Sequence, residues 1–135
     1  MAEILINSDS RYLINRSRIR HALQTYLDTI GISRKVEVSI AVVGSRKMKE
    51  LNKKYRQLEK ATNVLSFPLE SFDLAQDKQA AGFVSPDDGK LYLGDIVLCY
   101  PFLRQEAGKH KLMVDDWIDE LAVHGLEHLL GKHHE

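Results

Sequence analysis

The last twelve residues of the chain, HGLEHLLGKHHE, contain four of its six histidines. His124 and His128 are four residues apart, and on a helix this spacing places both imidazoles on the same side, one turn apart. Such a pair is a recurrent way of holding Zn²⁺ through two nitrogens. Gly131 then allows the chain to leave the helix and turn back, so that His134 or its neighbour His133 can supply a third nitrogen. The spacing therefore predicts a zinc site on the C-terminal helix.

Three histidine ligands leave a fourth position open, as in catalytic zinc sites. An ion in such a site can lower the pKa of a bound water to about 7 or polarise a phosphoryl oxygen. The simpler alternative is a solvated polar tail, because helical HxxxH pairs are common. HGLEH also matches the H-x-x-E-H motif of one class of metalloproteases, but only seven residues follow His128, and that class takes its third ligand from far downstream. Glu127 flanks the histidines, either near the reacting groups or as a solvated surface carboxylate.

Basic residues are concentrated in two segments, although the net charge of the chain is zero. Residues 46–60 contain seven basic and two acidic residues, and residues 11–20 contain four arginines and no acid. The zero net charge argues against a generic polyanion-binding protein. The two segments are therefore either solvated helix faces or a surface that binds phosphate.

Hydrophobic spacing indicates the elements that must position these residues. It predicts strands at 2–7, 35–44, 63–69 and 90–100, with Pro68 placing the third at a sheet edge or end. It predicts helices that begin near residue 15 and end at Gly31, run over 46–57 behind Ser45, run over 101–107 and end at Gly108, and run over 113–130. In the last helix Trp117 and Leu121 form an apolar stripe that continues into His124 and His128. Residues 70–89 lack periodicity and are predicted to form a surface loop.

These elements predict an α+β fold with a single small mixed sheet of three to four strands and about four to five helices, packed mainly on one side. A length of 135 residues and 44% hydrophobic residues fit one domain over residues 1–135. The single cysteine, Cys99, fits a reducing compartment. The N-terminal sequence is unlike a secretory signal and no apolar run is long enough to span a membrane, so we expect a cytoplasmic protein without membrane partners.

The sequence HGLEHLLGKHH resembles the H-G-x-L-H-L-x-G-x-D-H signature of the YbeY family, zinc-dependent endoribonucleases that act in ribosomal RNA maturation. Three further blocks are similar to family blocks and occur in the family's order: LNKKYR at 51–56, TNVLSFP at 62–68 and LGDIVL at 93–98. The resemblance covers most of the chain. Four ordered blocks are far more specific than one HxxxH pair.

The resemblance implies one Zn²⁺ held by His124, His128 and His134, which favours His134 over His133. It also implies a functional role for Arg56, whose guanidinium can bind a phosphate bidentately and stabilise transition-state charge. On this interpretation Arg46, Lys53 and Lys54 contact the RNA backbone. The implied function is a single-strand-specific endoribonuclease acting in rRNA maturation and ribosome quality control. We expect a monomer whose partners are single-stranded rRNA and, with it, the ribosomal subunit or ribosomal proteins.

The sequence departs from the family pattern near the proposed metal. Glu127 stands where the family usually has Leu, His133 where it has Asp, and Asn63 where it has Asp. We hypothesise that Glu127, a further catalytic candidate, partly replaces the missing carboxylate; otherwise the acid is dispensable. Cys99 stands where Ser is expected and fits a small buried position better than a zinc ligand.

Two other functions stay open from the residues alone: a small zinc metallopeptidase, and a non-catalytic ribosome-assembly factor stabilised by zinc. Assays with peptide and RNA substrates distinguish the metallopeptidase from a ribonuclease. Loss of folding without the metal identifies the assembly factor. The sequence leaves open whether water or the RNA 2′-hydroxyl attacks the phosphate.

Overall fold

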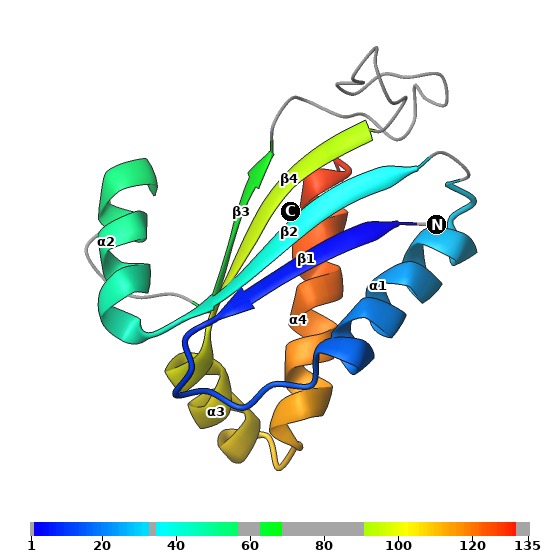
Figure 1. Ribbon diagram of the computed structural model, residues 1–135. Coiled ribbons are helices and arrows are strands. Elements are labelled where there is room, and N and C mark those ends of the chain that lie inside the picture. The colour runs from blue at the N-terminus through cyan, green and yellow to red at the C-terminus, as the bar shows by residue number, and fades with distance from the viewer. Residues whose placement is uncertain (1, 33–34, 57–62, 69–90, 132–135) are drawn as a thin grey trace.

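The computed structural model of the chain describes residues 2–32, 35–56, 63–68 and 91–131 (Figure 1). Its strands and helices follow the predicted order. They are β1 (Glu3–Ser8), α1 (Arg16–Thr29), β2 (Val36–Val43), α2 (Ser45–Arg56), β3 (Val64–Pro68), β4 (Leu91–Cys99), α3 (Tyr100–Lys109) and α4 (Val114–Leu129). The predicted loop at 70–89 lies outside the described residues. No helix in the described ranges is both long and apolar enough to cross a membrane.

The four strands form one mixed sheet in the order β1-β2-β4-β3. β1, β2 and β4 are parallel to one another, and β3 pairs antiparallel with β4 at the edge of the sheet. The edge position suits Pro68, which has no N–H to give to a further ladder. The predicted α+β class, the mixed sheet and the edge placement of this strand are all confirmed.

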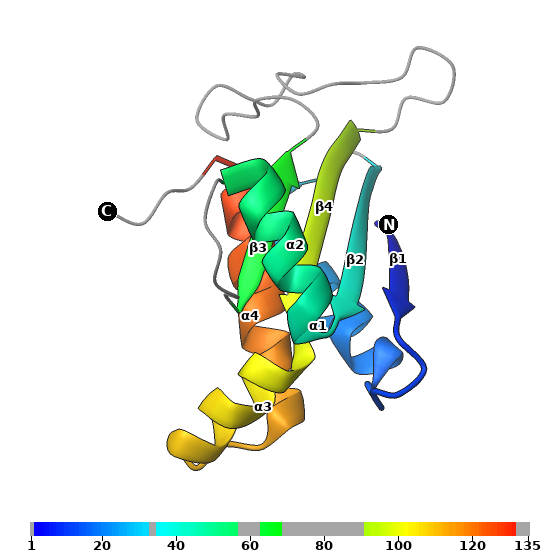
Figure 2. The same ribbon diagram turned by 90° about the vertical axis from the view of Figure 1, so that its left-hand side faces the viewer.

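Helices cover the two faces of the sheet unequally. α1 and α4 pack on the face formed by the alternating residues of β2, namely Val36, Val38, Ile40 and Val42. α2 packs on the opposite face, where Met48 joins Leu65, Val97 and Cys99 in a smaller cluster. Figure 2 shows α2 in front of β3, with α4 behind it. The prediction that helices lie mainly on one side therefore holds for α1 and α4, and α2 is the exception.

α4 is held close to the sheet and to α1. A Cβ atom added to Gly125 would lie 2.8 Å from Cγ2 of Ile96, so this position needs glycine for the helix to approach the sheet. The hydroxyl of Ser66 in β3 donates a hydrogen bond of 3.3 Å to the carbonyl of Gly125. Near the start of α4, Arg18 of α1 pairs with Asp116 and Asp119.

Two predicted helix ends behave differently. Gly131 has a φ of 88° directly after α4, as expected for a chain that leaves a helix in the left-handed conformation. Gly108, in contrast, lies inside α3, so the prediction that it ends this helix is wrong. An exposed glycine lowers helix stability without breaking the hydrogen-bond ladder. The turn after α3 instead uses Lys111 at a φ of 58°.

Candidate functional site

α4 brings the two predicted metal ligands of the described chain together. The ring centroids of His124 and His128 are 5.5 Å apart and the rings are inclined by 40°. Zn–N bonds of about 2.0–2.1 Å allow the centroids of two imidazoles that share an ion to be up to about 6 Å apart. The centroid distance is compatible with a shared ion, and imidazole nitrogen is a donor that Zn²⁺ commonly takes.

The histidines lie at the solvent edge of α4. The buried stripe of the helix consists of Ile118, Leu121, Ala122, Gly125, Leu126 and Leu129. His124 has a side chain that is 42% exposed, and His128 is exposed. The prediction that the buried stripe runs into the histidines is therefore wrong: they lie beside it. This arrangement leaves the imidazoles accessible to a ligand and spares them the cost of burying a polar ring.

The third predicted ligand, His134, lies outside the described residues, as does His133. Within the described part of the chain no group of three His, Cys, Asp or Glu side chains is arranged to hold a metal. A carboxylate lies close to His124: Oε1 of Glu127 is 4.0 Å from its Nδ1. The side chain of Glu127 is 23% exposed.

Arg56 is the last residue of α2, and the arrangement of the helices places its backbone at the same end of the molecule as His128. α2 and α4 run in the same direction on opposite faces of the sheet, and their C-terminal ends point to the same end in both views (Figures 1 and 2). We call this the histidine end. α4 packs against β3, and this edge strand lies between the two helices in Figure 2.

The basic residues predicted to contact RNA lie on the outer face of α2. Arg46, Lys53 and Lys54 are exposed, whereas Met48 and Asn52 are buried on the side that faces the sheet. This amphipathic arrangement is required both by a solvated helix face and by a surface that binds phosphate. The cations are solvated and, for the same reason, accessible to a phosphate backbone.

Asn63 and Cys99 lie at the other end of the sheet and away from the histidine end. The side-chain amide of Asn63 donates to both carboxylate oxygens of Glu106, at 3.2 and 3.4 Å. The indole N–H of Trp117 donates to the same carboxylate at 3.0 Å. The sequence analysis did not identify Glu106, because nothing in its local pattern marks it as the acceptor for two distant donors. Cys99 is fully buried, as expected for a small apolar position.

Comparison with known proteins gives a consistent match. The family model described as "Endoribonuclease YbeY" matches residues 6–135. A protein named Endoribonuclease YbeY from Acinetobacter baumannii is 36% identical over 122 residues, which cover 90% of this chain and 72% of the relative. A protein of the same name from Cellvibrio japonicus is 33% identical over 132 residues, covering 98% and 67%. The solution structure of TM1509 from Thermotoga maritima superposes with a TM-score of 0.60 at 22% identity, covering 98% of this chain and 75% of that one, and supports the fold.

Proposed function

The chain belongs to the YbeY family of endoribonucleases, and from this premise we propose that it cuts single-stranded RNA in rRNA maturation and ribosome quality control. The observation that carries the proposal is the histidine pair of α4, with ring centroids 5.5 Å apart on a helix fixed against the sheet. Zn²⁺ would be held by His124 and His128 together with His134. When bound, the ion supplies Lewis acidity at the scissile phosphate or toward water.

The residues of the chain itself bind and orient the RNA. Arg56 at the end of α2 offers a planar guanidinium with donors for two phosphate oxygens, which also stabilises charge that develops in the transition state. The exposed cations of α2, including Lys53 and Lys54, neutralise neighbouring phosphates. Single strands are favoured because a flexible backbone can follow a curved surface that an A-form duplex cannot enter.

Glu127 positions His124. A carboxylate 4.0 Å from Nδ1 needs only a small rotation to accept a hydrogen bond from that nitrogen. A proton fixed on Nδ1 leaves Nε2 with its lone pair as the metal-binding atom. Glu127 thus acts through His124, and it replaces the carboxylate that the family usually supplies from a later position.

We place this activity in the cytoplasm, in a monomer that works on rRNA in or near the ribosomal subunit. Co-sedimentation of the protein with ribosomal subunits, against a control lacking subunits, tests the partner, and sedimentation of the free protein tests the monomer.

The decisive experiment combines elemental analysis with RNA cleavage for the wild type, His128→Ala and Arg56→Ala. We expect one zinc per wild-type chain, loss of zinc and of cleavage in His128→Ala, and loss of cleavage with retained zinc in Arg56→Ala. A peptide substrate included in the same assay tests the metallopeptidase. Hydrolysis of that peptide, or unfolding of His128→Ala with no RNA cleavage by the wild type, would replace our proposal by one of the two alternatives.

A further inference from the structure

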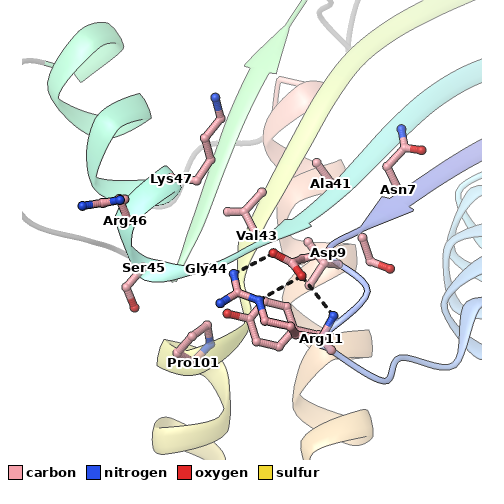
Figure 3. A pocket seen from close by; sticks show the side chains of 13 residues that line it. Asn7, Asp9, Arg11, Ala41, Val43, Gly44, Ser45, Arg46, Lys47 and Pro101 are labelled. Atoms are coloured by element: carbon pink, nitrogen blue, oxygen red, sulfur yellow. Dashed lines mark hydrogen bonds and ion pairs between the residues drawn. The ribbon is translucent and has the colours of Figure 1, made fainter.

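A pocket of about 650 Å³ opens at the end of the molecule opposite the histidine end (Figure 3). It lies where the carboxyl ends of β1 and β2 meet the first turn of α2. We call this the pocket end. Asp9 and Arg11 come from the segment after β1, Gly44 closes β2, and Arg46 and Lys47 begin α2. None of these residues lies at the histidine end, and only Arg46 is among the residues that the sequence predicts to contact RNA.

Charge in the pocket is strongly uneven. Arg11 donates to both carboxylate oxygens of Asp9, at 3.0 and 2.7 Å, so these two charges offset each other. Arg46 and Lys47 extend from the first turn of α2 in different directions, and neither has an ion-pair partner among the described residues (Figure 3). The pocket therefore carries an excess of two positive charges at its rim.

The placement of these two cations opposes the stability of their own helix. The peptide dipoles make the N-terminal end of α2 positive, which favours acidic residues and disfavours Arg and Lys there. The first turn of α2 contains no acidic residue. A local rule broken without an internal compensation is typical of a functional position. A bound anion would supply the missing compensation.

The wall of the pocket is fixed before any ligand binds. The ring of Tyr12 stacks on that of Tyr100, with centroids 4.7 Å apart and planes 19° apart. A Cβ added to Gly44 would lie 2.8 Å from the hydroxyl oxygen of Tyr12, so glycine permits this close approach. The Arg11 guanidinium lies 5.5 Å from the centre of the Tyr12 ring and is held by Asp9. A pre-formed wall lowers the ordering cost of binding.

We propose that this pocket binds a phosphate group of the RNA strand several nucleotides away from the cleaved bond, and that the outer face of α2 guides the strand between the two positions. The proposal rests on the proposed function. α2 has 12 residues and, at about 1.5 Å per residue, is about 18 Å long. That length matches about five nucleotides at the stacked spacing of about 3.4 Å, and fewer in an extended strand. Exposed Lys49 and Lys53 lie between the pocket and Arg56 on this face.

Binding of fluorescent single-stranded RNA tests the proposal with the double variant Arg46→Gln/Lys47→Gln. Glutamine keeps the helix propensity and removes both charges. The matched control is Lys109→Gln/Lys111→Gln, which removes two exposed cations at the end of α3 and in the turn that follows it. Anisotropy is measured with a trinucleotide and with a 12-nucleotide strand, whose integrity is checked on a gel, and circular dichroism verifies the fold of each variant.

We expect the pocket variant to bind the longer strand about tenfold more weakly, with the slope of log Kd against log salt concentration reduced by about 0.7, the value for one lost phosphate contact. Binding of the trinucleotide, and all binding by the control variant, should stay as in the wild type. Equal binding of the longer strand by pocket variant and wild type would overturn the proposal, as would an equal loss in the control. Because binding is measured apart from cleavage, a length-dependent loss in a protein that cleaves no RNA would contradict the proposed function and leave the pocket assigned.

Discussion

Helix packing holds the polar side chains in place at the histidine end, whereas polar contacts hold them at the pocket end. His124 and His128 lie at the edge of a helix that buries six residues against the sheet and its neighbours, and their rings remain accessible. At the pocket end, Asp9 is tied to Arg11, and Glu106 accepts from Asn63 and Trp117. The backbone of α4 thus fixes the geometry of the two histidines, whereas hydrogen bonds and ion pairs fix that of the polar side chains at the pocket end.

The proposed functions of the two ends account for this difference. Metal ligands must be held within a few tenths of an ångström while keeping their lone pairs free, and a rigid packed helix achieves both. A phosphate site tolerates looser placement, because the attraction between charges falls off slowly with distance. We therefore expect the histidine end to respond most to changes in packing and the pocket end to changes in charge.

The largest expected effect tests packing at the histidine end. Gly125→Ala places a methyl group 2.8 Å from Cγ2 of the fully buried Ile96, which we expect to lower the free energy of unfolding by about 2 kcal/mol. Gly108→Ala is the matched control, since nothing lies within 4 Å of its added Cβ and it lies inside α3. There we expect a gain of about 0.5–1 kcal/mol. Urea denaturation of both variants measures the difference, and equal stabilities would contradict the close fit of α4.

The second effect concerns the carboxylate of Glu127, which lies beside His124. Glu127→Gln should weaken zinc binding by about tenfold, at the low end for an outer-shell partner, because the side chain is partly exposed. Competition with a chromogenic chelator measures the affinity without any RNA. Glu127→Leu, which restores the usual family residue, should weaken it at least as much. Unchanged zinc affinity in both variants would remove Glu127 from the site.

Hydrophobic periodicity was sufficient to predict the order of the strands and helices, and the edge position of β3 followed from Pro68. It assigned the histidines to the buried face of α4, because Leu121 lies at the margin of that face, which is centred on Ile118, Gly125 and Leu129. Trp117 is only half-buried, and its indole N–H donates a hydrogen bond to Glu106. That contact joins residues on two helices, so spacing within one helix could not reveal it.

The histidine pair could be predicted because its members share one helix, where four residues always make one turn. The pocket could not, because it joins Asp9, Gly44 and Pro101 from three separate segments. The sequence did mark Arg46 and its neighbours as basic. What it lacked was the parallel pairing of β1 with β2, which places the segment after β1 beside the start of α2.

A third prediction replaces the hydrogen bond between Asn63 and Glu106 by a pair of carboxylates. Asn63→Asp restores the usual family residue and places a second carboxylate about 3.2 Å from that of Glu106. Two acids this close raise the pKa of one of them, and we expect a loss of about 1 kcal/mol of stability at neutral pH from the lost hydrogen bond and the repulsion. A raised folded-state pKa means that the penalty grows as pH rises through that value and disappears in acid. Measurements of the free energy of unfolding of wild type and variant at neutral and at acidic pH test this prediction. A stability difference that does not change with pH would contradict it.

The smallest effect contrasts two aspartates that both pair with arginine. The bonds from Arg11 lower the pKa of the partly exposed Asp9 to about 2. Burial raises the pKa of Asp119 despite its pairing with Arg18. The contribution of Asp9 to stability is therefore present above its usual pKa of 3.8 and is lost as pH falls toward 2, whereas that of Asp119 is greatest in acid and declines as pH rises above 3.8. Carboxyl carbon shifts followed by NMR should show these opposite displacements.

Arg11→Gln separates the two causes. It removes the donor that lowers the pKa of Asp9, so the midpoint of this carboxyl should return toward 3.8 while that of Asp119 stays where it was. Because this ion pair lies at the protein surface, global stability should change little, and the effect appears in the titration curve alone. An Asp9 midpoint that stays near 2 without Arg11 would show that something other than this ion pair fixes the charge at the pocket end. The contact between Arg11 and Asp9 would then no longer support the view that pairwise polar interactions hold the side chains at the pocket end.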